Sequence, residues 1–467
     1  LHKEYRRQRQ MCIRDSIHTN IMEKYRLSSY AISIELESEP DDSLLIHGYT
    51  GAIDLIDKSI VRFLIENPYF DRAVLPCEES TKDTLEKRGY ITLQTEDEEK
   101  EYFKRLATAL FRKESMLRKG FTFLITYDCN FRCPYCFEKD IQKDGTAFTK
   151  EMVDKAYQAI LQIAPDERLR SRSITLYGGE PLLKRNKNII SYIIEQGKEL
   201  GFKFSAISNG YDLKYYEDLL SPEDISFIQI TIDGIRERHN QRRIHYQGYP
   251  TFDTIVENIG IALNKGVAIS VRVNADRNNI EDLEGLQTIF CDLGYTENPL
   301  FSINSALLRN YSDSTEKAYQ YFSQKDFIEW HKKHGLESTC QDYGVYRRIH
   351  AAIKQGKPLS FRSTFCSAQT GGFVFDPFGR IYTCWETVNQ KEHCIGNYSL
   401  NNDIVWNEQV EERWRKTYLL ENAICASCKY ALLCGGGCPA QNLQKHRCTH
   451  MEDIVHNAAN KAYLSIK

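Results

Sequence analysis

The stretch that decides the fold is the octapeptide at residues 129–136, which reads CNFRCPYC. It places three cysteines, Cys129, Cys133 and Cys136, on one loop after an apolar run at 121–126 that predicts a buried strand. Three thiolates this close suit three irons of a cubane [4Fe–4S] cluster and leave the fourth iron without a protein ligand. An open coordination position makes a metal site reactive. Zinc is the alternative, but a structural zinc site takes four protein ligands.

The composition narrows the class of protein. A chain of 467 residues predicts two or three domains, and 42% hydrophobic and 27% charged residues are typical of a globular protein. A net charge of −3 gives no attraction to nucleic acid or anionic lipid. We expect no membrane span and no signal peptide, because long apolar runs are missing. The 15 cysteines then indicate metal ligands in a reducing cytoplasm rather than disulfides.

The order of the predicted elements indicates an α/β fold. Strands are expected at 121–126, 173–177, 203–208, 227–232, 268–274 and 301–306, with helices at 149–164, 187–200 and 252–265 between them. Alternating strands and helices form a parallel sheet or barrel, and six units are too few for a closed eight-stranded barrel.

Polar motifs gather where these strands end, which is where parallel α/β folds place their chemistry. The cysteine loop follows the first strand. The others are Gly178-Gly179-Glu180-Pro181 after the second strand, Ser208-Asn209 after the third, Thr231 at the end of the fourth, and Arg272 and Asn274 on one face of the fifth.

Together these motifs resemble the radical S-adenosylmethionine (SAM) enzymes, whose signature is CxxxCxxC followed by GGEP. The resemblance implies a partial (β/α)6 TIM barrel over residues 117–310. It also implies that SAM chelates the free iron and is cleaved reductively to a 5′-deoxyadenosyl radical, which abstracts hydrogen from the substrate. By the same resemblance Glu180 binds the SAM amino group, and Thr231 and Arg243 bind its ribose or carboxylate, with Arg242 as an alternative to Arg243. Tyr135 would pack near the adenine. The other residues expected to line the SAM site are Gly178, Gly179, Pro181, Ser208, Asn209, Arg272 and Asn274.

The C-terminal cysteines resemble the SPASM domain of radical SAM maturases, which binds two auxiliary [4Fe–4S] clusters. The resemblance assigns Cys366, Cys384 and Cys438 to one cluster, and Cys425, Cys428, Cys434 and Cys448 to the other. With the cysteine loop this makes three clusters in all. The first auxiliary set lacks one ligand, for which Cys340 and Cys394 are candidates unless the position is open. A zinc ribbon over 425–438 is the alternative.

The N-terminal unit resembles the winged-helix domain that binds leader segments in maturases of ribosomally made peptides. Strands at 30–36, 43–49 and 51–55, followed by helices, form a small α+β unit whose sheet edge suits an added peptide strand. A packing domain without a ligand is the alternative. The expected organisation is a disordered or foreign leader at 1–22, a leader-peptide recognition domain at 23–112, the barrel at 117–310, a helical bridge at 311–360 and a SPASM domain at 361–467.

The resemblance implies an enzyme that cross-links a ribosomally made precursor peptide, for example through a thioether. Its partners would be that peptide and an external flavodoxin or ferredoxin as electron donor. A formylglycine-generating sulfatase maturase is one alternative, but those enzymes place an Asp after the cysteine equivalent to Cys384, where this chain has Trp385 and then Glu386. A second alternative is a non-catalytic iron–sulfur electron carrier, which would leave the GGEP motif unexplained.

Overall fold

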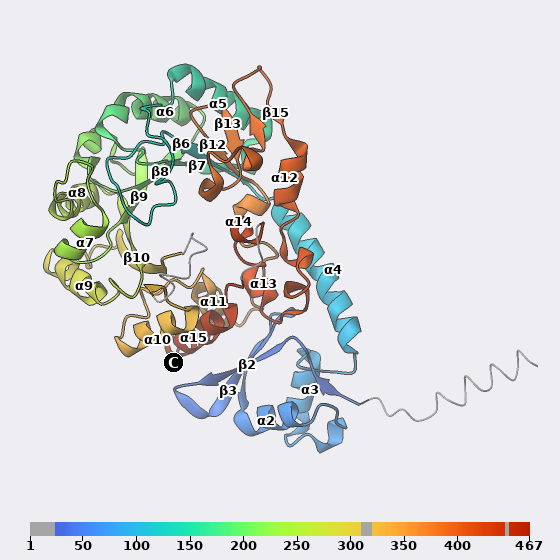
Figure 1. Cartoon of the computed structure of the whole chain (residues 1–467). Coiled ribbons are helices and arrows are strands. Elements are labelled where there is room, and N and C mark those ends of the chain that lie inside the picture. The colour runs from blue at the N-terminus through green and yellow to red at the C-terminus, as the bar shows by residue number, and fades with distance from the viewer. Residues whose placement is uncertain (1–23, 310–319, 444–447) are drawn as a thin grey trace, which may run out of the picture.

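A computed structural model describes residues 24–309, 320–443 and 448–467 (Figure 1). The leader expected at 1–22 therefore lies outside the described residues. Figure 1 shows three parts: a small N-terminal unit, a curved sheet covered by helices, and a C-terminal region that lies between them. None of the helices in the described ranges has the length and apolarity that crossing a membrane requires.

The central sheet confirms the partial barrel. Six parallel strands lie side by side in chain order, and they are β6 (Lys119–Leu124), β7 (Arg170–Tyr177), β8 (Lys203–Ser208), β9 (Ile225–Thr231), β10 (Ala268–Ala275) and β11 (Phe301–Leu307). Helices cover the outer face of this sheet, namely α5 (Lys150–Ile163), α6 (Lys187–Glu199), α7 (Arg236–Arg242), α8 (Phe252–Asn264) and α9 (Asp282–Asp292) (Figure 1). The C-terminal ends of the strands therefore meet at one mouth, as the sequence predicts.

The C-terminal region extends the barrel sheet, which sequence analysis did not predict. β12 (Gly372–Phe375) pairs in parallel with β6, and three antiparallel strands follow it: β13 (Arg380–Tyr382), β14 (Gly396–Asn397) and β15 (Val405–Trp406). Phe373 and Phe375 of β12 are buried in the same core as Phe121 and Phe123 of β6. Apolar packing therefore joins this region to the barrel, in addition to any metal it holds.

The N-terminal unit has the expected strands and helices. An antiparallel sheet contains β2 (Ala31–Leu36), β3 (Glu39–His47) and β4 (Ile53–Asp57), and β1 (Arg26–Leu27) pairs with β5 (Ile91–Thr92). Its helices are α2 (Lys58–Glu66), α3 (Glu79–Lys87) and α4 (Glu96–Ser115). Asp57 caps α2, because its carboxylate accepts the Ser59 N–H at 2.7 Å. α4 ends at Ser115, a few residues before Lys119 begins β6.

This unit shares a hydrophobic core with the end of the chain. Ile32 of β2 and Ile46 of β3 pack in one cluster with Ile349 of α11 (Val345–Gln355) and Ile454 of α15 (Met451–Leu464). The segment expected as a helical bridge contains α11 and, before it in the chain, α10 (Gln324–Lys333). Gly48 has no space for a side chain, because a Cβ there would lie 2.3 Å from the carbonyl oxygen of Lys429. The unit is therefore docked closely and is not a loosely tethered module.

Candidate active site

The cysteine loop lies at the mouth of the barrel, directly after β6. Its backbone is fixed from two sides: Arg132 N–H donates to the Ile244 carbonyl at 2.7 Å, and the Asn209 amide donates to the Asn130 side chain at 2.7 Å. Phe131 N–H also points to Cys129 Sγ, with a distance of 3.3 Å between the two atoms. The loop is thus held by the segments that follow α7 and β8.

The three thiols of this loop are free and lie near one another. Burial, followed by the charges of Glu138 and Cys133, raises the pKa of Cys136 to about 11. Burial, followed by the charge of Glu180, also raises the pKa of Cys129, and Cys133 adds to that effect. Thiolates crowded in such a place are stabilised by a bound metal centre, which withdraws their charge.

Among the residues that the structure describes, no three His, Cys, Asp or Glu side chains lie close enough to share a single metal ion. Binding of a [4Fe–4S] cluster by the cysteine loop stays a prediction.

A buried network lies beside the cysteine loop. The Tyr135 hydroxyl donates to the Asp233 carboxylate, and Arg243 Nη1 donates to the Tyr135 hydroxyl at 3.0 Å. Asp233 is fully buried and also accepts the Asn274 N–H at 3.1 Å. Burial and the charge of Asp233 raise the Tyr135 pKa well above its usual value. The sequence analysis above assigns no role to Asp233. Its position between the end of β9 and α7, where the polar motifs gather, could have indicated a role in the site.

The structure distinguishes the two adjacent arginines. Arg242 binds carboxylates of the protein: its Nη1 lies 2.9 Å from Asp276, and its Nε lies 3.8 Å from Asp233. Arg243 has no carboxylate at ion-pair distance within the described ranges. The Nε of each arginine is buried without a hydrogen-bond acceptor, so this atom does not distinguish the two. Because Arg242 already has carboxylate partners, Arg243 stays the predicted ligand of the SAM carboxylate.

We expect Arg243→Gln to weaken SAM binding by about 10–150-fold, because it removes a charged partner worth about 1.5–3 kcal/mol. Equilibrium binding of SAM to the anaerobically reconstituted protein measures the effect, and iron content should stay unchanged. Arg242→Gln is the matched control, with a smaller loss of affinity. Equal SAM affinity in the Arg243→Gln variant and the unmodified protein would contradict this placement.

The GGEP motif supports the cysteine loop through its backbone. A Cβ at Gly178, where φ is +137°, would lie 2.3 Å from the Thr126 carbonyl oxygen, and one at Gly179 would lie 2.4 Å from the Asp128 carbonyl oxygen. Both glycines therefore allow close approach to the segment that leads into Cys129. Pro181 follows with its carbonyl bound by the Asn186 side chain at 3.0 Å.

Glu180 is already occupied by internal hydrogen bonds. Its carboxylate accepts from the Ser208 hydroxyl at 2.8 Å, from Asn209 N–H at 2.6 Å and from Leu182 N–H at 2.9 Å, and the residue is only 1% exposed. Burial raises its pKa to about 7, and these hydrogen bonds act in the opposite direction. Direct binding of the SAM amino group by Glu180 stays a prediction. In the structure this side chain connects the loops after β7 and β8.

The remaining predicted contacts lie on β9 and β10. Thr231 is buried at the end of β9, in register with Arg272 of β10. Arg272 Nε donates to Asn274 Oδ1 at 3.0 Å, so the two residues share one face of the strand. Their contact with SAM stays a prediction.

The C-terminal cysteines have two groups of neighbours. Cys384 has Cys366 and Cys438 as electrostatic neighbours, and Cys425 has Cys428, Cys434 and Cys448. That each group binds a cluster stays a prediction. Cys394 Sγ instead donates to the Gly396 carbonyl at 3.2 Å, and the charged neighbours of Cys340 are Asp342, Lys461 and Glu337. Neither residue is placed with the set of three.

The first set lies next to the barrel mouth. Arg309, which follows β11, pairs with Glu386 and lies 3.8 Å from Cys438 Sγ. Trp385 stacks on Tyr177 at the end of β7, with 5.2 Å between ring centroids. Residues from two strand ends thus contact the C-terminal region where these three cysteines lie.

Comparison with known proteins agrees with this geometry. Residues 123–287 match the radical SAM superfamily. A cysteine-type anaerobic sulfatase-maturating enzyme of Clostridium novyi is 22% identical over 322 residues, which cover 67% of this chain and 85% of that relative. A putative glycyl-radical enzyme activating enzyme of Methanocaldococcus jannaschii is 35% identical over 114 residues, or 24% of this chain and 40% of that relative.

Among solved structures, anSMEcpe with bound AdoMet superimposes with a TM-score of 0.55 at 18% identity, covering 74% of this chain and all of that one (100%). The family match thus identifies residues 123–287 as a radical SAM domain, the kind of domain that uses a [4Fe–4S] cluster and SAM, and the solved structure shares its fold.

Proposed function

We propose that this protein is a radical SAM peptide maturase that removes hydrogen from a ribosomally made precursor and installs a cross-link, such as a thioether. The observation that carries the proposal is an open strand edge in the N-terminal unit, which is docked against the cysteine-rich C-terminal region. An open edge is the feature by which a sheet captures an extended peptide.

The N-terminal sheet has two edges, and only one is suited to a peptide. The edge at β2 is bound by α15, because Asn460 donates to the Glu35 carbonyl at 3.0 Å and accepts the Glu37 N–H at 2.8 Å. The edge at β4 pairs with β3 on its inner side, and within the described residues no strand pairs with its outer side. A leader strand would therefore add to β4.

The register predicts which groups of β4 receive the leader. His47 N–H donates to the Ala52 carbonyl at 2.9 Å, so His47 and Ala52 form a hydrogen-bonded pair. Antiparallel pairs alternate, so the backbone groups of Ile53 and Leu55 point away from β3. The Ile53 carbonyl agrees with this assignment, because it accepts from Arg88 Nη2 at 3.1 Å. Leu55 is 47% exposed and presents its backbone to the edge.

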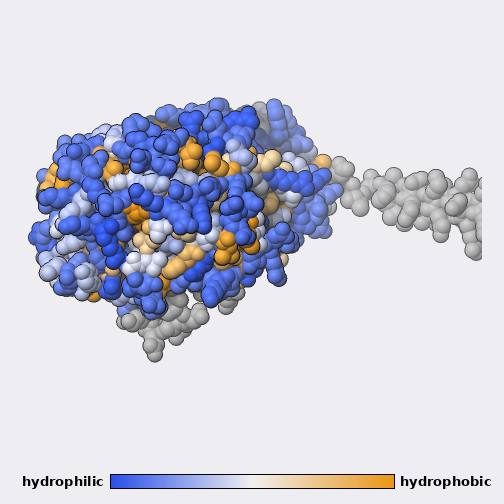
Figure 2. Space-filling view, turned by 90° about the horizontal axis from the view of Figure 1, so that it is seen from above, coloured by the Kyte–Doolittle hydropathy of each residue, from blue (hydrophilic) through white to orange (hydrophobic). Residues whose placement is uncertain are grey.

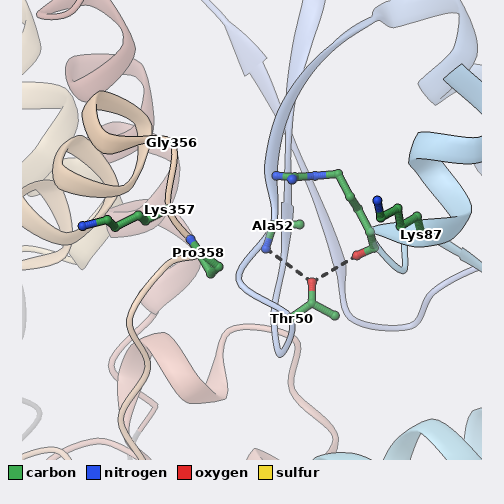
Figure 3. A pocket seen from close by; sticks show the side chains of 7 residues that line it. Thr50, Ala52, Lys87, Gly356, Lys357 and Pro358 are labelled. Atoms are coloured by element: carbon green, nitrogen blue, oxygen red, sulfur yellow. Dashed lines mark hydrogen bonds between the residues drawn. The ribbon is translucent and has the colours of Figure 1, made fainter. Parts of the chain in front are cut away.

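A cavity lies beside the start of this edge (Figure 3). Its volume is about 190 Å³, and it is lined by Thr50, Ala52, Lys87, Arg88, Gly356, Lys357 and Pro358. Thr50 shapes one wall, because its hydroxyl donates to the Arg88 carbonyl at 3.1 Å and accepts the Ala52 N–H at 3.3 Å (Figure 3). Arg88 is already paired with Asp54, and the Lys357 side chain points away from Thr50 in Figure 3, so the cavity offers room for a leader side chain without selecting its charge.

The residues at the barrel mouth have distinct roles in this proposal. When bound, the cluster and SAM supply an electron and a 5′-deoxyadenosyl radical, with reducing equivalents from an external flavodoxin or ferredoxin. Cys129, Cys133 and Cys136 would hold the cluster. Arg243 would bind the SAM carboxylate, and Tyr135, itself bonded to Asp233, fixes the position of the Arg243 guanidinium. The two C-terminal cysteine sets would hold two further clusters, whose chemistry would be to take up the electron that cross-linking releases.

A sulfatase-maturase activity is the second candidate. It is favoured by the Clostridium novyi relative, of which this chain covers 85%. Against it, the carboxylate nearest in sequence to Cys384 belongs to Glu386, which is held in an ion pair with Arg309.

Incubation of the anaerobically reconstituted enzyme with SAM, dithionite and a deuterated precursor peptide tests the proposal. A suitable precursor is a short peptide encoded beside the enzyme. We expect deuterium in 5′-deoxyadenosine and a peptide product that has lost two hydrogens and kept its sulfur. Conversion of a Cys to an aldehyde would favour the second candidate. SAM cleavage without any transfer of deuterium from the peptide would contradict both.

A further inference from the structure

A second hollow lies at the opposite end of the barrel, where the parallel strands begin. Its volume is about 340 Å³, and it is formed by the N-terminal ends of β7 and β8 with the segments just before β6, β7 and β8. Five cationic side chains line it, together with one carboxylate, that of Glu167. These five are Arg118, Arg168, Arg170, Arg172 and Lys203. The whole chain has a net charge of −3, so this is a strong local concentration of positive charge.

Carboxylates neutralise only part of this charge. Arg168 pairs with Asp166 at 2.7 Å, and Lys203 pairs with Glu223 at 3.3 Å. In the part of the chain that the structure describes, Arg118, Arg170 and Arg172 have no carboxylate at ion-pair distance. Three guanidinium groups around one hollow repel one another unless an anion lies between them.

Arg170 gives a second, independent indication that this hollow binds an anion. Its Nη2 donates to the Pro165 carbonyl at 3.4 Å, whereas its Nε is buried and has no acceptor among the described residues. Buried donors are normally satisfied, so an orphaned one on the wall of a cationic hollow indicates a missing acceptor. Gly201 leaves further open space in the hollow, because no atom lies within 4 Å of the point where its Cβ would be.

We propose that this hollow binds a small phosphate-bearing anion of the diphosphate class. Arginine forks match the paired oxygens of phosphate groups, and three of them around one hollow suit a ligand with two linked phosphates. The size of the hollow favours a small anion over the surface of an acidic protein.

The site would lie outside the reaction centre. β6 has six residues, so at about 3.3 Å per residue the hollow lies on the order of 20 Å from the cysteine loop. An anion there contacts the first residues of β7 and β8, whose other ends carry the GGEP motif and Ser208. The bound anion would therefore stabilise the barrel, and this effect does not depend on which substrate the enzyme modifies.

Titration calorimetry of the reconstituted enzyme with inorganic pyrophosphate, at an ionic strength held constant with NaCl, tests the proposal. We expect one saturable site per chain. Arg172→Gln should weaken binding by about 10-fold, and Arg170→Gln combined with Arg172→Gln by more, because each change removes a charge-assisted contact. Arg172 is exposed, so its single variant should fold normally. Arg62→Gln, on α2 of the N-terminal unit, is the matched control and should bind as the unmodified protein does.

Two results would overturn the site. One is heat indistinguishable from that of NaCl at the same ionic strength, which would indicate a non-selective basic surface or one that takes an acidic protein. The other is equal pyrophosphate affinity in the unmodified protein, the Arg172→Gln variant and the double variant.

Discussion

Replacement of Cys129, Cys133 and Cys136 with Ala is expected to leave about eight irons per reconstituted chain instead of about twelve, and to abolish SAM cleavage. The reason is that these thiols are the proposed ligands of the cluster that binds SAM, whereas the two C-terminal sets have other cysteines as neighbours and would keep their own clusters. Iron analysis and chromatography of 5′-deoxyadenosine after dithionite addition measure both effects.

The matched control replaces three cysteines outside the proposed sets. Cys291, Cys340 and Cys394 are free thiols that the structure places apart from the three groups. The variant Cys291→Ala, Cys340→Ala and Cys394→Ala should keep about twelve irons and full SAM cleavage. Loss of about four irons in this control would show that one of these cysteines completes a cluster. One or two zinc ions per chain with little iron, in the unmodified protein, would contradict the cluster assignment itself.

The variant Leu55→Pro is expected to lower modification of a full-length precursor by about 10²-fold or more, the lower end of the gain that tethering gives. Leu55 lies on the edge strand β4, with its backbone N–H directed away from β3. Proline removes that donor and is tolerated on an edge, so the sheet should persist while the leader loses its pairing. Rates of peptide modification measure the effect, and SAM cleavage without peptide should not change.

Leu55→Ala is the matched control because it shortens the side chain and keeps the N–H. It should modify the precursor at a rate within a few-fold of the unmodified enzyme. A core peptide without its leader should be modified equally by the Pro variant and the unmodified enzyme. If the Pro variant modifies the full-length precursor at the unmodified rate, β4 does not bind the leader.

The barrel could be predicted from sequence because its signals are local. Each strand is a short apolar run, and each motif follows directly in the chain, as Gly178 follows β7 and Asn209 follows β8. Parallel topology then brings the strand ends together without further information. The start of β7 at Arg170 was missed by three residues, because the polar run before Ile174 hides it.

The remaining features depend on contacts between distant segments. β12, β13, β14 and β15 contain only two to four residues each, too few to show a period. The role of Glu180 also depends on partners about 28 residues away, Ser208 and Asn209, which no spacing rule connects to it. Likewise, Arg242 and Arg243 are neighbours in sequence, and only their different acceptors distinguish them.

The core shared by β2, β3, α11 and α15 has a consequence for how the chain folds during synthesis. β2 and β3 are synthesised long before Ile454 and Val455, the residues of α15 against which they pack. The apolar face of the N-terminal sheet therefore stays uncovered until α15 is made, and until then Ile32, Ile34 and Ile46 are accessible to other chains. β6 waits in the same way for β12 at its outer edge. Premature termination before α15 would thus leave this sheet incompletely folded, so the N-terminal unit and α15 depend on each other as one cooperative unit.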